Sequence, residues 1–278
     1  MRSRSVITRK VISPFRILRD EGVASLFAKA RRKARLWLVC FAARGVKSVT
    51  LDGCVFGLNM IPNNAMKVSL LKQKYERFER HAVLQYIRPE YPVVELGACI
   101  GVVSCVTNRI LKNPASHVVV EANPHVIPIL ESNRNGNHCE FEILNRAVAY
   151  DQESVTISPS SDFRGTSLRE NVHQSFQIPS VTVSTIGLGM IVTPRGYDRF
   201  TLICDIEGHE YELVQRESQI FEKVDTLILE THARLIGEAK HSEMMAKLAE
   251  LGFRTIDEDS FVVVMRRNAS SPTEDQGA

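Results

Sequence analysis

The sequence is poor in aromatic residues and has little net charge. Aromatic side chains make up 7% of the 278 residues, and Trp37 is the single tryptophan. Proteins that bind single-stranded nucleic acid use aromatic side chains as stacking platforms, so this composition argues against that class and we expect no nucleic-acid partner. The formal net charge of +3 is too small to indicate any other partner.

Long apolar runs and paired cysteines are also missing. No stretch reaches the roughly 18 consecutive apolar residues that a membrane span needs. The cysteines include no C-x-x-C pair and no spacing typical of a zinc site, so we expect no structural metal, and buried free thiols in a reducing, cytoplasmic setting. The six cysteines are Cys40, Cys54, Cys99, Cys105, Cys139 and Cys204.

Positive charge is concentrated at the start of the chain. Residues 1–40 hold eleven lysines and arginines but only two acidic residues, so a basic arm precedes a mildly acidic body. Within residues 26–43 a basic cluster leads into an apolar run that contains Trp37. Such a segment can dock on the body as a helix, or it can lie in a membrane interface, here the inner membrane surface. We expect a basic helical N-terminal extension (1–60), a folded domain (61–267) and a frayed polar tail (268–278).

The body alternates apolar strands with helices. Continuous apolar strands that alternate with helices form a parallel sheet covered on both faces, so we expect an α/β fold with a mostly parallel, doubly wound sheet. In such sheets, ligands bind at the carboxyl ends of the strands. We expect strands at 93–96, 117–121, 140–144, 154–157, 181–184, 201–205, 225–230 and 261–265, and helices at 102–111, 124–135, 210–221 and 238–251.

Two glycines follow the first of these apolar strands. Gly97 lets the backbone turn tightly, and Gly101 lets the next helix approach a ligand closely. A dinucleotide fingerprint requires a glycine where Cys99 stands, which disfavours pyrophosphate binding. Glu95 beside the turn would repel a phosphate and suit an ammonium group, and Glu121 after the next strand can accept hydrogen bonds from both hydroxyls of a ribose. These features fit S-adenosylmethionine; the alternative is that the glycines only form a turn and Glu121 caps a helix.

A second group of polar residues follows the central strands. Asp205 and Glu207 come after a fully apolar strand with i, i+2 spacing, His209 follows them, and His232 comes after the next such strand. Because parallel strands end at one edge of a sheet, we expect these side chains to lie close together. If the ligand is S-adenosylmethionine, the reaction is a methyl transfer, and a general base must remove the proton of the acceptor hydroxyl. We name Asp205 and His209 as candidates for this base, with His232 behind them. The carboxylates could instead bind Mg²⁺, or they could cap the next helix.

Motif-like residues occur in five short stretches, at Glu95–Gly101, Glu121–Pro124, Asn145–Val148, Asp205–Glu210 and Leu229–His232. In order and spacing these stretches resemble FkbM-type methyltransferases, over about residues 93–256. The resemblance implies a class I, Rossmann-like fold that uses S-adenosylmethionine for O-methylation of sugars, glycans or macrolide-like hydroxyls. It also implies that Gly97 and Gly101 line the amino acid end of the cofactor, that Glu121 holds the ribose, and that Asn145 and Ala147 lie near the adenine. The cofactor-binding residues that we expect are Glu95, Gly97, Ala98, Gly101, Glu121, Asn123, Asn145 and Ala147.

Two positions depart from the family pattern. Ala122 stands where proline is frequent, and Thr185-Ile186-Gly187 lacks the aspartate that commonly follows Thr-Leu there. The second departure removes the ground for assigning an acceptor-side role to that turn.

We therefore expect an S-adenosylmethionine-dependent O-methyltransferase that acts on a carbohydrate, a glycan or another polyhydroxylated small molecule. The alternatives are a nicotinamide-dependent oxidoreductase on a similar sheet and a non-catalytic, membrane-associated scaffold. The sequence indicates neither the particular acceptor nor the oligomeric state.

Overall fold

The computed structural model describes residues 31, 45–61, 63–159, 166–167 and 180–268. The described residues from Lys47 onwards form one compact unit. The basic segment 26–43 lies outside the described residues except for Arg31, and so does the polar tail after Asn268. In the part of the chain that the structure describes, no helix has both the length and the apolar character to cross a membrane.

A mixed sheet forms the centre of this unit. Among the described residues it has seven strands, in the order β12-β13-β11-β10-β3-β4-β5. The five strands from β11 to β5 pair in parallel, and β13 pairs antiparallel with both β11 and β12. The predicted α/β class with a mostly parallel sheet is confirmed. The strands are β3 (Val93–Leu96), β4 (His117–Val120), β5 (Glu142–Leu144), β10 (Phe200–Cys204), β11 (Val224–Glu230), β12 (Phe253–Asp259) and β13 (Val262–Arg267).

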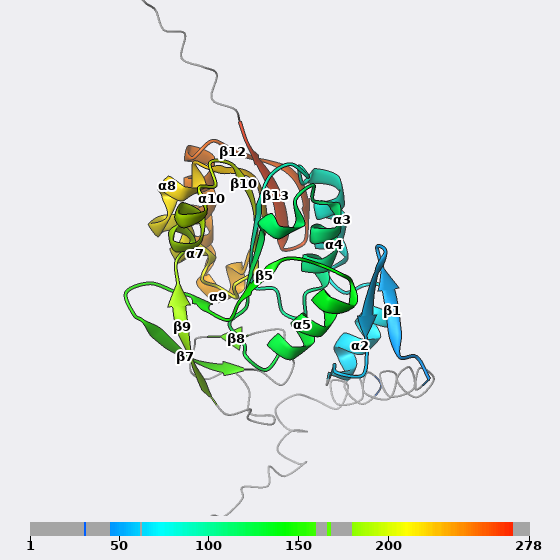
Figure 1. Ribbon diagram of the computed structural model, residues 1–278. Helices are drawn as coiled ribbons and strands as arrows, with labels where there is room; N and C mark the ends of the chain where they lie inside the picture. Colours follow the sequence, from blue (N-terminus) through cyan, green and yellow to red (C-terminus); the bar gives the residue numbers. More distant parts are fainter. Residues whose placement is uncertain (1–30, 32–44, 62, 160–165, 168–179, 269–278) are drawn as a thin grey trace, which may run out of the picture. The chain divides into compact units, whose positions relative to one another are not determined.

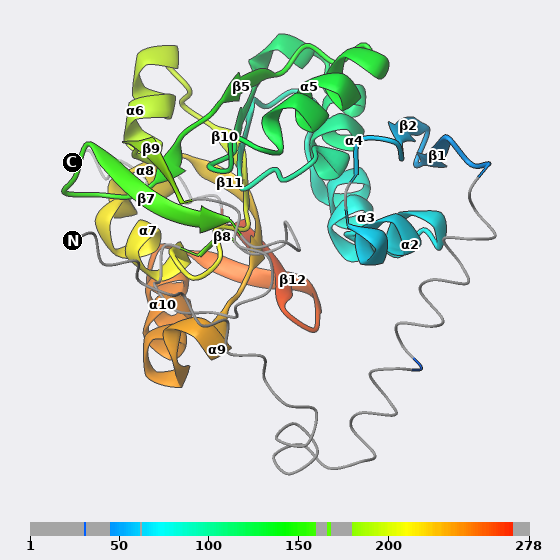
Figure 2. The ribbon, with the colours of Figure 1, turned by 90° about the horizontal axis from the view of Figure 1, so that it is seen from below.

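Helices cover both faces of the sheet (Figures 1 and 2). Successive strand residues point to opposite faces, so Val93 belongs to the apolar cluster beneath α3, α4 and α5, whereas Val94 belongs to the cluster beneath α6, α7 and α10. The central strands β3, β4, β10 and β11 are thereby buried on both sides, as their apolar sequences predict. The helices are α2 (Asn64–Leu71), α3 (Arg77–Tyr86), α4 (Val102–Ile110), α5 (Ile127–Gly136), α6 (Leu188–Val192), α7 (Glu210–Arg216), α8 (Ser218–Phe221), α9 (Ala233–Ile236) and α10 (Glu238–Glu250), with short 3₁₀ turns at Pro114–Ser116 and Thr193–Arg195.

A smaller sheet lies between β5 and β10 in the sequence. In the described residues its order is β6-β9-β7-β8. The two short strands predicted at 154–157 and 181–184 are its antiparallel pair β7 and β9. Its strands are β6 (Ala147–Val148), β7 (Ser154–Pro159), β8 (Thr166–Ser167) and β9 (Val181–Ile186).

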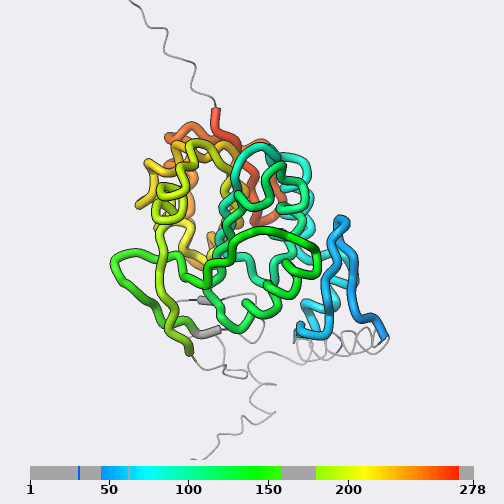
Figure 3. Tube along the Cα trace, viewed as in Figure 1, coloured from blue at the N-terminus to red at the C-terminus, as the bar shows by residue number. Residues whose placement is uncertain are grey.

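A β-hairpin precedes the helices and packs on the body. It consists of β1 (Ser48–Leu51) and β2 (Cys54–Gly57). The side chain of Asn137, next to α5, accepts a hydrogen bond from the Val55 N–H at 2.6 Å and donates one to the Val55 carbonyl oxygen at 2.8 Å. The tube trace shows the hairpin in blue near the green α5 (Figure 3). These residues fall within the predicted N-terminal extension (1–60), and in the structure they are part of the compact unit that begins at Lys47.

Some element boundaries differ from the predicted ones. The expected helix 210–221 is divided into α7 and α8 at Glu217, whose backbone is not helical (φ −110°, ψ 23°). The helix expected from residue 124 begins at Ile127, after a turn in which the Asn123 side chain accepts a hydrogen bond from the His125 N–H at 3.0 Å. β12 was not predicted, because its sequence FRTIDED contains no apolar run and it lies at the sheet edge.

Candidate active site

A cavity of about 290 Å³ opens at the carboxyl ends of β3, β4, β10 and β11. This is the edge at which parallel α/β sheets bind ligands, and the volume is close to the lower limit of small-molecule sites. Six of the predicted site residues line it: Gly97, Glu121, Ala147, Asp205, Glu207 and His209. The other predicted residues, Glu95, Ala98, Gly101, Asn123, Asn145 and His232, do not line it.

The turn after β3 requires glycine. Gly97 has a φ of +89°, and a Cβ atom there would lie 1.7 Å from the backbone oxygen of Asp205. Gly101 has a φ of +78°, and its Cβ would meet Leu130 Cδ1 at 2.3 Å. The two glycines therefore let the turn pack against the strand end of β10 and against α5 without intervening side chains.

Glu121 joins the turn after β3 to the turn after β4. Its Oε2 accepts a hydrogen bond from the Cys99 N–H at 2.7 Å, and its Oε1 accepts one from the Asn123 N–H at 2.6 Å. Burial raises the pKa of Glu121 to about 7, although these backbone hydrogen bonds oppose the shift. Cys99 itself has a φ of 48°, in the left-handed region that side chains rarely occupy. A buried carboxyl group with acceptor capacity thus stands on the cavity wall.

Glu95 and Asn145 lie behind the cavity wall. Ser104 Oγ donates to Glu95 Oε1 at 2.8 Å, and His117 Nε2 lies 3.3 Å from Glu95 Oε2. Glu95 also borders a smaller cavity of about 30 Å³ next to Gly97. The Asn145 side chain donates to the Glu121 carbonyl oxygen at 2.8 Å, so it braces the backbone beside the cavity. Both residues can shape the site without lining its main cavity.

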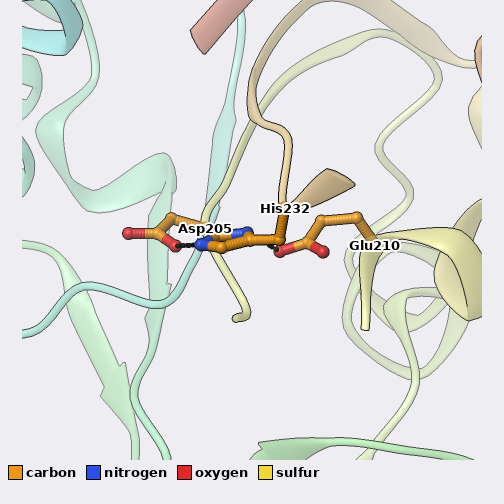
Figure 4. Close-up of side chains that lie close together, drawn as sticks. All are labelled: Asp205, Glu210 and His232. Carbon is orange, nitrogen blue, oxygen red and sulfur yellow. Dashed lines mark hydrogen bonds and ion pairs between the residues drawn. The ribbon is translucent and has the colours of Figure 1, made fainter. Parts of the chain in front are cut away.

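His232 lies among several carboxylates (Figure 4). Its Nδ1 is 2.9 Å from Glu210 Oε1, and its Nε2 is 3.4 Å from Glu207 Oε2 and 3.7 Å from Asp205 Oδ1. Glu230, at the end of β11, lies 3.8 Å from the same Nε2. The predicted convergence of the two strand ends is therefore observed.

Charges in this cluster shift one another's pKa values. Burial lowers the pKa of His232, but the hydrogen bond and charge of Glu210, with the charges of Glu207 and Glu230, outweigh it and raise that pKa. Burial, followed by the charges of Glu230 and Glu207, raises the pKa of Asp205 well above its ordinary value. His232 therefore keeps its proton to a higher pH than an ordinary histidine, and Asp205 keeps its proton to a higher pH than an exposed aspartate.

Glu210 is a site residue that we did not predict. It is 0% exposed, and its Oε1 accepts hydrogen bonds from the N–H groups of Ile206 (3.0 Å) and Gly208 (3.2 Å) as well as contacting His232. The signal was present, because Glu210 is the last acid of the stretch Asp205–Glu210. Its burial, however, could not be inferred from that stretch.

One set of residues could hold a metal ion. Asp205, Glu210 and His232 each offer a ligand atom, and these atoms lie within 4.8 Å of one another. However, the imidazole stands between the two carboxylates in Figure 4, with one ring nitrogen toward each. An ion bound to one ring nitrogen would have to displace at least one of these contacts.

The connection between α2 and α3, with the first turn of α3, forms a cavity wall that the sequence did not reveal. Lys74, Tyr75, Glu76 and Glu79 all line the cavity. Six carboxylates face the cavity in total, against two basic side chains, so its wall is suited to a cation. The acids are Glu76, Glu79, Glu121, Asp205, Glu207 and Glu230, and the bases are Lys74 and Arg146.

Comparisons with known proteins identify a family. Residues 95–255 match the family model "Methyltransferase FkbM domain". Among solved structures, the chain is similar to a ribosomal protein L11 methylase from Lactobacillus delbrueckii subsp. bulgaricus, with 10% identity, a TM-score of 0.40, and coverage of 70% of this chain and 80% of that one. It is also similar to a precorrin-6y C5,15-methyltransferase from Geobacter metallireducens GS-15, with 12% identity, a TM-score of 0.40, and coverage of 78% and 96%. No curated protein matches the sequence.

Proposed function

Because the chain belongs to the FkbM family of S-adenosylmethionine-dependent methyltransferases, we propose that it methylates a hydroxyl oxygen of a carbohydrate, a glycan or another polyhydroxylated small molecule. Family membership makes it an enzyme, so the oxidoreductase and scaffold alternatives are not retained. The resemblance supplies the acceptor class, and the site supplies the residues that would carry out the reaction.

The cavity fits S-adenosylmethionine. When bound, this cofactor supplies a methyl group on a positively charged sulfur atom. The excess of carboxylates on the wall favours such a cation. We assign Glu121 to the ribose hydroxyls and the turn at Gly97 to the amino acid end. Ala147 and Asn145 follow β5, on the side that we assign to the adenine, and Gly101, Ala98 and Asn123 shape the two turns from behind.

The observation that carries the proposal is the position of the Asp205 carboxyl group. It stands on the cavity wall directly after β10, and its raised pKa makes it a better proton acceptor than an ordinary aspartate. We assign Asp205 as the general base that takes the proton of the acceptor hydroxyl at a carboxylate oxygen. His209 lines the same wall and is the second candidate, while Glu207 and His232, whose pKa is raised, lie beside Asp205.

The experiment uses the purified protein with S-adenosylmethionine that carries an isotope-labelled methyl group. Sugars, glycans and their deoxy analogues serve as acceptors, and mass spectrometry with NMR locates the label. We expect the label on one hydroxyl oxygen, and no transfer to the analogue that lacks this hydroxyl. Label found on nitrogen or carbon would overturn the proposal. Mass spectrometry of cell glycans and lipids, with and without the gene, would identify the natural acceptor by the methyl group that is lost.

We further propose that the enzyme works in a reducing, cytoplasmic compartment. The structure pairs none of the five cysteines of the described residues in a disulfide, which agrees with such a setting. The segment 26–43 remains a candidate for docking on the body or for contact with the inner membrane surface. Sedimentation with anionic vesicles distinguishes these two roles. If the segment binds membranes, the full chain sediments with the vesicles and a chain that begins at Lys47 stays in solution. If the segment docks on the body, both chains stay in solution.

A further inference from the structure

Among the ionisable side chains of the residues that the structure describes, Glu210 forms a hydrogen bond or ion pair with His232 only. It does not line the cavity, yet its Oε1 lies 2.9 Å from His232 Nδ1. The other ring nitrogen, Nε2, faces the carboxylates of Glu207 at 3.4 Å and Asp205 at 3.7 Å. The side-chain contact through which Glu210 reaches the cavity wall is therefore the imidazole ring.

Glu210 is itself held rigidly. It is 0% exposed and begins α7, and the N–H groups of Ile206 and Gly208 donate to the same Oε1 that contacts His232. Gly208 has a φ of +99°, so the backbone of this loop is bent to present its N–H group. Three donors converge on one oxygen atom, which leaves the carboxylate little freedom to rotate.

The geometry points to Glu210 as a positioning residue for methyl transfer: it fixes the plane of the His232 ring so that Nε2–H faces Asp205 and Glu207. This inference rests on the proposed function, in which Asp205 is the general base. A carboxylate that accepts the proton of one ring nitrogen fixes the orientation of a histidine ring, as outer partners do in many enzyme sites, and in the imidazolium the second nitrogen is then a donor of defined direction.

The charges around His232 explain why its orientation matters. Asp205 and Glu207 face it from the loop after β10, Glu230 from β11 and Glu210 from α7. These like charges repel one another, and the imidazolium is the cation between them. A ring that turned away would leave Asp205 without its countercharge, and Asp205 would hold a proton up to a higher pH.

The test compares Glu210→Gln with the wild-type enzyme. Glutamine keeps the size of the side chain and an oxygen acceptor for the loop N–H groups, but it loses the charge that holds His232. We expect kcat to fall on the order of tenfold or more, the KM for S-adenosylmethionine to stay unchanged, and the acidic limb of the pH–kcat profile to move, because the charges of Glu210 and of the His232 ring both act on Asp205. The matched control is Glu212→Gln, since Glu212 lies on the same helix and pairs with Arg216 at the surface, 3.0 Å away. Its profile should equal that of the wild type.

A double-mutant cycle separates positioning from a general structural role. In a His232→Gln background, Glu210→Gln should cause little further loss of kcat, because its effect passes through the ring. Additive losses, or a wild-type pH profile for Glu210→Gln, would overturn the inference. If Glu210→Gln does not fold, Glu210→Asp replaces it. This variant keeps the charge but shortens the side chain, and its pH–kcat profile and double-mutant cycle with His232→Gln are measured in the same way.

NMR titration of His232 in the cofactor-free protein needs no acceptor and so separates this inference from the proposed function. We expect the His232 ring to lose its proton at a lower pH in Glu210→Gln than in the wild type. An unchanged titration would contradict the positioning role even if methyl transfer to a hydroxyl is established. Selective broadening of the His232 signals by added Mn²⁺ at micromolar concentration would assign the cluster to a metal and would also overturn it.

Discussion

Gly97 and Asp205 approach each other so closely that no side chain fits between them. A Cβ atom at Gly97 would lie 1.7 Å from the Asp205 carbonyl oxygen, and the Asp205 N–H donates to the carbonyl oxygen of Leu96 at 2.9 Å. The turn after β3 and the turn after β10 are thus in direct backbone contact. The turn that we assign to the cofactor and the residue that we assign as the base therefore share one wall of the cavity.

Replacing Gly97 should disrupt both turns. Gly97→Ala places a side chain at a φ of +89° and against the Asp205 backbone, and the strained backbone alone costs about 1–3 kcal/mol. We expect a lower melting temperature by calorimetry and loss of S-adenosylmethionine binding. The control is Gly136→Ala at the end of α5, where a Cβ would meet nothing within 4 Å. Equal behaviour of the two variants would show that the contact at Gly97 is not required.

Cofactor affinity should depend on the ionisation of Glu121. Burial raises the pKa of this carboxyl group to about 7, so its ionised form, the better acceptor for ribose hydroxyls, becomes dominant only above that pH. We expect the dissociation constant from calorimetry to decrease as the pH rises through 7. Glu121→Gln should remove this dependence, and Glu121→Ala should weaken binding by about 1–3 kcal/mol. A wild-type affinity that is independent of pH would rule out Glu121 as the ribose acceptor.

Removing the Asp205 carboxylate should impair turnover and spare cofactor binding. Asp205→Asn keeps the shape of the side chain but cannot accept a proton, and general-base catalysis contributes about 10²–10⁴-fold in rate. Because the pKa of Asp205 is raised, we expect wild-type kcat to increase with pH as the carboxylate forms, and the variant to lack that increase. Full turnover by Asp205→Asn would transfer the role of base to His209, which His209→Gln would then test.

Sequence patterns located the cavity because they depend on strand ends. Gly97, Glu121 and Asp205 each follow a continuous apolar run, and parallel pairing brings the ends of such runs to one edge of a sheet. Glu76 and Glu79 could not be found in this way, since they come from the connection before α3 and from its first turn, and reach the cavity only through the tertiary fold. For Glu95 the reverse holds: its place in a strand was evident from the sequence, but the face of the sheet that its side chain takes was not.

Glu95 sits on β3, where residue spacing does not reveal which face a polar side chain takes. The structure places it beneath α4, with Ser104 and His117 as partners rather than on the main cavity wall. A charged residue in an apolar strand can face a ligand or a buried polar partner, and the sequence is the same in both cases. Glu210 was missed for a related reason, because its burial depends on how α7 packs.

Methyl transfer should not require a divalent metal. The imidazole of His232 directs one nitrogen to Glu210 and the other to Asp205, and its raised pKa favours the imidazolium, whose positive charge lies between these carboxylates. We expect activity to persist after dialysis against EDTA and to change little when Mg²⁺ is added. Loss of activity in EDTA with recovery on Mg²⁺ would instead assign Asp205, Glu210 and His232 as ligands.

The hairpin β1–β2 should be part of the stable folding unit. Leu51 and Phe56 are buried in the apolar cluster beneath α4, and Arg80, with its side chain 6% exposed, forms an ion pair with Asp52. A chain that begins at residue 61 would expose this cluster and leave Arg80 unpaired, and an unpaired buried charge costs about 3–5 kcal/mol. We expect that chain to melt at a lower temperature than one that begins at Lys47, by circular dichroism.

A point substitution tests the same contact in the full chain. Asn137→Ala removes both hydrogen bonds to Val55, and loss of the partner of backbone groups costs about 1–3 kcal/mol where these groups are shielded from water. The Val55 side chain is exposed, so we expect the low end of this range in urea unfolding. Asn135→Ala is the control, because Asn135 is exposed and its side chain contacts only the neighbouring Arg134 among the hydrogen bonds of the described residues. If Asn137→Ala is as stable as this control, and the chain from residue 61 melts with the longer one, then the hairpin adds nothing to the stability of the methyltransferase unit and belongs with the extension.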